Sequence, residues 1–278
     1  MITMSRAPGV PEEITRYYQE VAEEGRLSAG PAQLEFERTK EVVLRYLPPP
    51  PGIVLDVGGA SGAYALWLAE RGYQVHLIDP ALRLVEEARR RSEASPHRIR
   101  SCQLGDAREL TSDDGAADGV LLLGPLYHLT EAEERLRALR EVHRVLRPGG
   151  VMFAAAISRC ASALDGIARD LFADPRFAAI VRQDLEQGQH RNETDNRDYF
   201  TTAYFHRPDE LGAEVASAGF HCQAVIGLEG PGWVLSDFDA RWANPRKRED
   251  LLRVARALEK EASIVGLSAH LLAVGTKE

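Results

Sequence analysis

Short apolar runs that alternate with longer segments of helical spacing constrain the fold of this 278-residue chain more than any other feature. Five such runs come first, at Ile53–Val57, Gln74–Ile78, Ile99–Leu104, Gly119–Leu123 and Val151–Ala156. The helical segments between them are Ala63–Arg71, Leu82–Arg91 and Glu131–Leu146. Near-continuous apolar strands separated by helices are typical of a parallel sheet that is covered by helices on both faces.

The same alternation returns near the C-terminus, where two more strands are expected. The pattern there predicts a helix at Pro208–Ala218, a strand at Phe220–Ile226, a helix at Lys247–Ala262 and a strand at Ala269–Thr276. The whole pattern therefore predicts an α/β fold with a seven-stranded, mostly parallel sheet.

Four consecutive prolines, Pro48–Pro51, divide the chain near its start. Proline fixes φ and removes a backbone donor, so this run must end the helix before it. It separates an N-terminal helical arm, residues 1–50, from a core made of residues 51–156 and 207–278. The insertion between the two core segments, residues 157–206, begins as helix and becomes polar and aromatic. Because a long insertion at such a place is usually functional, we expect it to form a cap.

Charge and composition argue against several classes of protein. The formal net charge of −8 disfavours general electrostatic binding to the phosphate backbone of nucleic acid. No uncharged apolar run is long enough to cross a bilayer, and the N-terminus lacks the apolar segment of a secretion signal, which together predict a cytoplasmic protein. The cysteines Cys102, Cys160 and Cys222 form no CxxC pair, so neither a disulfide framework nor a metal site is expected.

The first predicted strand runs into a glycine-rich turn, VLDVGGASG at positions 54–62. Glycine allows φ above zero and lets a ligand approach the backbone closely. A helix N-terminus after such a turn attracts anions such as a pyrophosphate, but Asp56, two residues before Gly58, works against an anion. The carboxylate therefore favours a cationic amino-acid group in this turn.

Acidic residues also follow the second and third predicted strands. Asp79 ends the second strand, where its carboxylate can accept both hydroxyls of a ribose. Asp106 follows the third strand and can accept from an adenine amino group. The fourth strand ends at Leu123 and Gly124, with polar residues just beyond. Because ligands of open α/β sheets bind at the carboxyl ends of the strands, these elements predict one crevice.

As a set, these motifs resemble those of the class I S-adenosylmethionine (SAM) dependent methyltransferases. VLDVGGASG is similar to the first motif of the family, LID (77–79) to the acidic ribose motif, GDA (105–107) to the adenine motif, LLLGPLYHL (121–129) to the fourth motif and LRPGG (146–150) to the turn before the fifth strand. The arm sequence YYQEVAEEGRL looks like that of small-molecule members from bacteria. Ala60 departs from the pattern, since the family usually has a third glycine there.

The resemblance implies a Rossmann-like fold, SAM as cofactor and S-adenosylhomocysteine as product. The residues that it assigns to the cofactor are Tyr18 (or Tyr17), Arg38, Asp56, Gly58, Gly59, Gly62, Asp79, Pro80, Asp106, Ala107, Leu123 and Gly124. In this assignment the glycines shape the turn around the methionine portion, and Asp56 lies near its amino group. Arg38 pairs with its carboxylate, and Tyr18 closes over it.

The acceptor side depends on fewer residues. Methyl transfer needs an in-line approach of the two reactants, and a base is needed only where the acceptor must lose a proton. His128, just past the fourth motif, is the candidate base, because imidazole titrates near neutrality. Candidate substrate-binding residues are Tyr127, Tyr199, Tyr204 and His206. Packing or capping roles are the alternative for all five.

Two rival classes share parts of the pattern. A NAD(P)-dependent oxidoreductase has the same fold, but it would need G-x-G-x-x-G and gives no reason for Asp56. A non-catalytic SAM-binding protein would show degraded motifs, and Ala60 is the one departure of that kind. The expected acceptor is a small molecule, methylated on oxygen or nitrogen and less readily on carbon or sulfur. Neither nucleic acid nor a membrane is expected as a partner, and the oligomeric state is left open.

Overall fold

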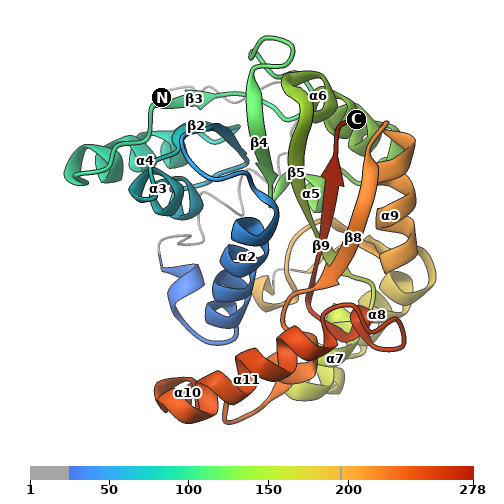
Figure 1. Cartoon of the computed structure of the whole chain (residues 1–278). Coiled ribbons are helices and arrows are strands. Elements are labelled where there is room, and N and C mark those ends of the chain that lie inside the picture. Colours follow the sequence, from blue (N-terminus) through green and yellow to red (C-terminus); the bar gives the residue numbers. More distant parts are fainter. Residues whose placement is uncertain (1–24, 195) are drawn as a thin grey trace, which may run out of the picture.

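The computed structural model describes residues 25–194 and 196–278, and a nine-stranded sheet runs through these residues (Figure 1). The strands are β1 (Ile53–Val57), β2 (Gln74–Asp79), β3 (Ser101–Leu104), β4 (Ala117–Leu122), β5 (Leu146–Ser158), β6 (Gln189–His190), β7 (Ala203–His206), β8 (His221–Gly227) and β9 (His270–Thr276). Their order is β3-β2-β1-β4-β5-β7-β6, with β9 paired to β5 and to β8. Neighbours among β1 to β5 are parallel, whereas β9 is antiparallel to both of its partners.

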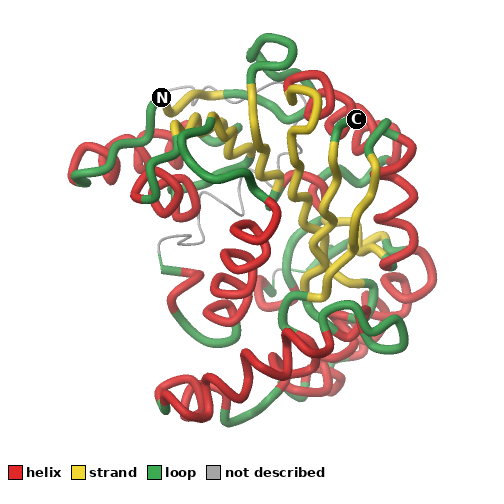
Figure 2. Tube along the Cα trace, in the orientation of Figure 1, coloured by secondary structure: helices red, strands yellow, loops and turns green. Residues whose placement is uncertain are grey.

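Helices cover both faces of the sheet, as the sequence predicts (Figure 2). The α-helices are α2 (Ala32–Tyr46), α3 (Ala63–Glu70), α4 (Leu82–Ala94), α5 (Pro125–His128), α6 (Ala132–Val145), α7 (Ala161–Ala168), α8 (Pro175–Gln187), α9 (Pro208–Ser217), α10 (Phe238–Ala243) and α11 (Pro245–Leu258). Short 3-10 turns are η1 (Arg26–Ser28), η2 (Leu171–Ala173), η3 (Arg197–Tyr199), η4 (Gly230–Val234) and η5 (Val265–Leu267).

Two apolar layers hold the helices to the sheet. One layer joins α2, α3 and α4 to the strands, and the other joins α6 and α9. Val54 and Leu55 are adjacent in β1 yet belong to different layers, because successive side chains of a strand point to opposite faces. The α/β prediction is confirmed, and α2 ends before the proline run.

The predicted strand count is wrong: the described residues hold nine strands, not seven. The two additional strands, β6 and β7, both come from the insertion. β5 runs on to Ser158, past its predicted end, and its last residues pair with β7 through Ile157 to Phe205 and Ser158 to His206. Strands of two and four residues are too short to show a periodic pattern, so tertiary pairing rather than local sequence defines them.

The parallel strands β1 to β4 place their carboxyl ends at one edge of the sheet. Asp56 lies near the end of β1, Asp79 ends β2, and α5 begins just after β4. The helices α7, α8, α10 and α11 gather at the end of the molecule where β5 finishes (Figure 1). Among the described helices, none is both long and apolar enough to span a membrane.

Candidate functional site

A cavity of about 400 Å³ opens at the carboxyl edge of the parallel strands. Its walls are contributed by residues within 25–28, 35–36, 56–64, 79–91, 105–108 and 123–129. Most of the residues that the sequence assigns to a cofactor therefore lie around one space. They are Asp56, Gly58, Gly59, Asp79, Pro80, Asp106, Ala107, Leu123 and Gly124.

The turn after β1 brings the backbone against the cavity. Gly58 has φ of 72°, and a Cβ there would lie 2.6 Å from Cδ of Pro125. Ala60 also has positive φ, 47°, which explains why glycine is usual at this position of the motif. Gly62 does not line the cavity but starts α3 with φ of 83°, so its role is conformational.

Asp56 is an unusually placed carboxyl group. It is 1% exposed, and its Oδ2 has no hydrogen-bond partner among the described residues. Burial, with the charge of Asp79 as a second cause, raises the pKa of Asp56 to about 7. A backbone hydrogen bond from Ala65 offsets part of this rise, but a buried carboxyl with one unpartnered oxygen is still costly to ionise, and a cation beside it lowers that cost. The geometry therefore fits a cationic ligand group here.

Asp79 is held in place by backbone donors. Its Oδ2 accepts from the N–H of Ala60 at 2.9 Å, and its Oδ1 accepts from the N–H of Ala81 at 2.9 Å. Each carboxylate oxygen has more than one acceptor site, so these bonds orient the group and still permit bonds from a ligand. An oriented carboxylate at the end of β2 is suited to a pair of hydroxyl groups.

Asp106 is engaged by its neighbour Arg108. Nη2 of Arg108 lies 2.6 Å from Oδ2 of Asp106, and Nη1 lies 2.6 Å from Oε1 of Glu134. Burial pushes the pKa of Asp106 upward, but the hydrogen bonds from Arg108 outweigh it, so the pKa lies below its ordinary value. Asp106 is thus an ionised, oriented acceptor at the β3 end of the cavity.

His128 and Tyr127 line the cavity from α5 and the residues around it. The two rings lie 4.6 Å apart, and Nδ1 of His128 is 3.4 Å from the carbonyl oxygen of Thr202. Burial lowers the pKa of His128 to about 4. The expectation that this imidazole titrates near neutrality is therefore wrong, because the ring, half-buried in the cavity wall, has lost much of the hydration that stabilises its cation.

The structure does not bring Arg38 to the cavity. Its side chain is fully buried and pairs with Glu41 and Glu259, which ties α2 to the residue after α11. The predicted pairing of Arg38 with a cofactor carboxylate is corrected on this ground. Tyr17 and Tyr18 lie outside the described residues.

Three predicted substrate residues in the insertion also point elsewhere. The hydroxyl of Tyr199 donates to Asp174, and Nε2 of His206 lies 3.1 Å from Oε2 of Glu214. Tyr204 packs under the guanidinium of Arg135, 3.8 Å from its ring centre. None of the three lines the cavity, because a hydrogen bond directs Tyr199 to the start of α8, while contacts with Arg135 and Glu214 direct Tyr204 and His206 toward α6 and α9. The described insertion meets the site from behind α5, where Thr202 and Phe200 contact His128 and an apolar cluster of the insertion packs against Tyr127.

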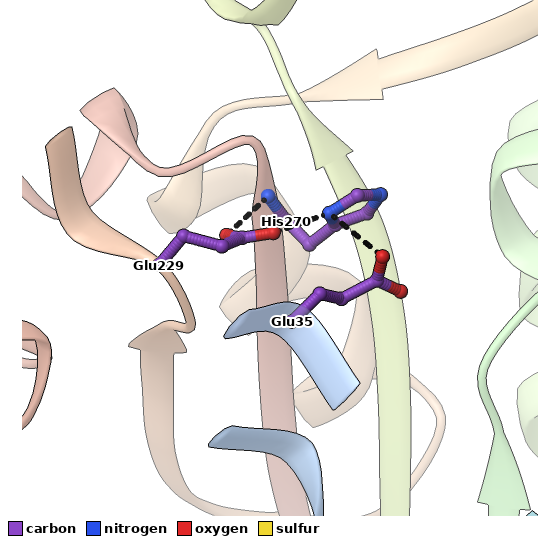
Figure 3. A group of neighbouring side chains, drawn as sticks. All are labelled: Glu35, Glu229 and His270. Carbon is purple, nitrogen blue, oxygen red and sulfur yellow. Dashed lines mark hydrogen bonds and ion pairs between the residues drawn. The ribbon is translucent and has the colours of Figure 1, made fainter. Parts of the chain in front are cut away.

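Two residues outside the predicted motifs complete the wall on the α2 side. Arg26 and Glu35 line the cavity, with Nη1 of Arg26 3.0 Å from Oε2 of Glu35. Behind them, Figure 3 shows Glu35 and Glu229 facing His270. Nδ1 of His270 lies 2.6 Å from Oε1 of Glu229 and 3.8 Å from Oε2 of Glu35.

The Glu35, Glu229 and His270 group has donor atoms within 4.8 Å of one another, a spacing that could suit a metal ion. Burial opposes protonation of His270, but the charges of Glu35 and Glu229 outweigh it and raise its pKa to about 9. With Arg26 paired to Glu35, two cations balance two carboxylates. A metal ion would have to displace a tightly held proton, so the group is better described as a network of ion pairs.

Comparison with known proteins identifies the family. A model of the methyltransferase domain matches residues 54–150. A ubiquinone biosynthesis O-methyltransferase of Pseudomonas paraeruginosa is 32% identical over 181 residues, which are 63% of this chain and 67% of that protein. An uncharacterized methyltransferase of Mycobacterium bovis is 35% identical over 129 residues, 45% of this chain and 49% of the relative, so the chain spans about half the length of that relative.

A solved structure agrees at the level of the fold. The SAM-dependent methyltransferase from Methanosarcina mazei superimposes with a TM-score of 0.58 at 18% identity, covering 85% of this chain and 96% of the other. The chain belongs to the class I SAM-dependent methyltransferases, and SAM is its cofactor. Family membership favours this class over the NAD(P)-dependent oxidoreductases that share its fold.

Proposed function

We propose that this enzyme transfers the methyl group of SAM to a hydroxyl oxygen of a small-molecule acceptor, with a nitrogen acceptor as the alternative. The names of the Pseudomonas relatives, ubiquinone biosynthesis O-methyltransferases, support an oxygen acceptor. The cavity, with its carboxylates at the ends of β1 and β2, supports the position of the cofactor.

The residues around the cavity fit SAM. The unpartnered Oδ2 of Asp56 would accept from the cationic amino group, and the backbone of the turn at Gly58 and Gly59, which lines the cavity, would lie beside the methionine chain. Asp79 would accept the ribose hydroxyls, while Asp106, with Ala107, would face the adenine. The oriented carboxylate of Asp79 is the single observation that carries this assignment, because it lies at the end of β2 in the cavity wall, where the two hydroxyls of a ribose could both donate to it.

When bound, SAM supplies a methyl group made electrophilic by its sulfonium. The protein supplies the position, because two reactants held at near-attack distance need little further assistance. An acceptor would approach from the β4 side, along the part of the cavity wall formed by Leu123, Gly124 and Tyr127. Apolar and aromatic side chains there would also exclude water.

His128 is neutral at physiological pH, because burial holds its pKa near 4. The contact of Nδ1 with a carbonyl oxygen requires the proton on Nδ1, which places the ring lone pair on Nε2. We assign His128 the role of accepting a hydrogen bond from the acceptor hydroxyl and taking its proton as the methyl group is transferred. Because a pKa near 4 makes the ring a weak base, His128 would act mainly by orienting the hydroxyl, and the proton released on methyl transfer would pass on to solvent.

Calorimetry with SAM tests the position of the cofactor. Asp79→Ala should weaken SAM binding at least tenfold, about 1.4 kcal/mol. Asp118→Ala is the matched control, since Asp118 also bonds a backbone N–H, that of Ile53, but lies outside the cavity. Equal affinities in wild type and the Asp79 variant would refute the ribose assignment.

Transfer of labelled methyl from SAM to a panel of phenols, catechols and amines tests the acceptor class. Product from phenols or catechols alone would support the oxygen acceptor. Product from amines alone would refute it.

A further inference from the structure

Residues 199–202 of the insertion link η3 to β7 and meet His128 behind α5. The ring centres of Phe200 and His128 lie 6.2 Å apart with 28° between the planes, and the carbonyl oxygen of Thr202 lies 3.4 Å from Nδ1 of His128. A carbonyl oxygen can only accept, so this contact favours the tautomer with its proton on Nδ1 and its lone pair on Nε2. The 199–202 segment therefore influences how the ring lies and which nitrogen can accept from a hydroxyl.

The backbone of Phe200 is strained. Its φ is 66° and its ψ is −172°, a region that is essentially restricted to glycine. Residues in such a conformation persist only where their surroundings hold them, and they cluster at functional sites. Two side chains hold this one: Nδ2 of Asn192 donates to the carbonyl oxygen of Phe200 at 2.7 Å, and Nε2 of His190 donates to that of Tyr199 at 2.7 Å. The conformation of the segment thus depends on these contacts.

His190 is the buried centre of this support. It is 1% exposed, its ring is stacked on that of Phe205 at 4.7 Å, and its Nδ1 lies 2.9 Å from Oδ2 of Asp184. Asp184 is fully buried in α8, and the hydroxyl of Ser162 in α7 donates to it at 2.6 Å. Because the carbonyl oxygen of Tyr199 can only accept, Nε2 of His190 carries a proton. Asp184 orients the ring so that this proton points at Tyr199.

We propose that His190 and Asp184 are positioning residues for methyl transfer, which hold the 199–202 segment against His128 and so keep its ring in the orientation and tautomer that receive the acceptor hydroxyl. The inference rests on the role proposed above for His128. Strand pairing adds a second link, because His190 lies opposite Ala203, the first residue after the segment. A buried polar pair of this kind seldom stabilises a fold more than apolar side chains of the same size, so orientation is the gain that it brings.

A double-mutant cycle tests the proposal. His190→Phe keeps a ring against Phe205 but offers no donor to Tyr199. With the panel acceptor that wild type methylates fastest, this variant should lower kcat at least tenfold and change KM and SAM affinity less than threefold. In the His128→Ala background, the same substitution should lower kcat less than twofold further. Asp184→Asn should act in the same direction with a smaller loss, three- to tenfold, and it replaces His190→Phe if that variant does not fold.

Arg159→Met is the matched control. Arg159 is 5% exposed, and like His190 it bonds one backbone carbonyl, that of Phe205 at 2.7 Å, and one carboxylate, that of Glu210 at 2.6 Å. These bonds lie toward the end of β7, whereas the 199–202 segment precedes its start. The kcat of this variant should stay within threefold of wild type. A loss as large as that of His190→Phe would show a general effect of the insertion and refute the proposal.

Proton–nitrogen NMR spectra of the histidine rings give a readout that needs no turnover. The signals of His128 are assigned by their loss in His128→Ala. At pH 7 the ring should carry its proton on Nδ1 in wild type and in Arg159→Met, and it should shift toward the Nε2 tautomer in His190→Phe.

Two results overturn the proposal: an equal loss of kcat from His190→Phe with and without His128, or an unchanged His128 tautomer in the His190 variant. A residue that only supports the fold would give the first of these, because its effect would not depend on His128. Failure of the proposed function is distinguishable from both. If wild type methylates no member of the panel, the proposed function fails, while the NMR spectra still decide whether His190 positions the ring.

Discussion

Asp56→Asn should stabilise the ligand-free protein at alkaline pH while weakening its hold on SAM. The ordinary pKa of the carboxyl is 3.8, and burial raises it to about 7 in the folded chain. The folded protein therefore keeps a proton that the unfolded chain loses, and the free energy of unfolding falls as pH rises from about 4 to 7. The difference of about three pKa units corresponds to at most about 4 kcal/mol, lost in full above pH 7.

Asparagine has nearly the same shape and no charge, so it should remove this penalty. Urea unfolding without ligand should show the variant more stable than wild type at pH 8, by up to about 4 kcal/mol, and nearly equal to it at pH 4. SAM affinity should fall at least tenfold in the same variant, because a carboxylate facing a cation is lost. Asp118→Asn, whose carboxyl shows no such burial, serves as control. No gain at pH 8, or the same gain at both pH values, would refute the reasoning.

Two further predictions follow from the titrating groups. SAM binding to wild type should weaken as pH falls below 7, toward about tenfold per pH unit, because Asp56 must lose its proton when SAM binds. Asp56→Asn should abolish this pH dependence. A wild-type affinity that does not change with pH in calorimetry would contradict the prediction. His128→Ala should lower kcat roughly a hundredfold with SAM affinity nearly unchanged. Since the pKa of His128 is near 4, its titration should not change the kcat of wild type between pH 6 and 8. A change of kcat over this range that is absent from the variant would contradict the lowered pKa.

Local sequence predicts the core strands closely, as well as the acidic residues that line the cavity. β1 has the predicted bounds Ile53–Val57, because an apolar run of that length has one favourable environment, the buried centre of a parallel sheet. Asp79 and Asp106 line the cavity as predicted, since parallel strands bring their carboxyl ends to one edge whatever the details of packing.

The arm and the insertion were harder to predict, because their contacts are distant in sequence. The resemblance assigns Arg38 to a cofactor carboxylate, but in the structure Arg38 pairs with Glu259, which lies 221 positions away in the sequence. Tyr204 and His206 lie in a polar and aromatic segment of the kind that often forms a lid. In the structure, however, Tyr204 packs against Arg135 and His206 contacts Glu214, two residues of other helices. Composition indicates which groups need partners, and only the tertiary fold decides which partners they find.

The cluster behind Arg26 shows the same limit. Glu35, Glu229 and His270 come from α2, the loop after β8 and the start of β9. None of them belongs to a motif, and each alone is an ordinary residue of a helix, loop or strand. A pattern of conserved charge at three separated positions would be the one sequence signal able to reveal them.

A crystal structure of the protein with S-adenosylhomocysteine would test the central claim most directly. The ligand should lie in the cavity at the carboxyl edge of β1, β2 and β4, with its ribose hydroxyls within hydrogen-bond distance of Asp79 and its amino group beside Asp56. A ligand bound elsewhere, or in this cavity with its adenosine at Asp56 and its amino-acid end at Asp79, would contradict the assignment.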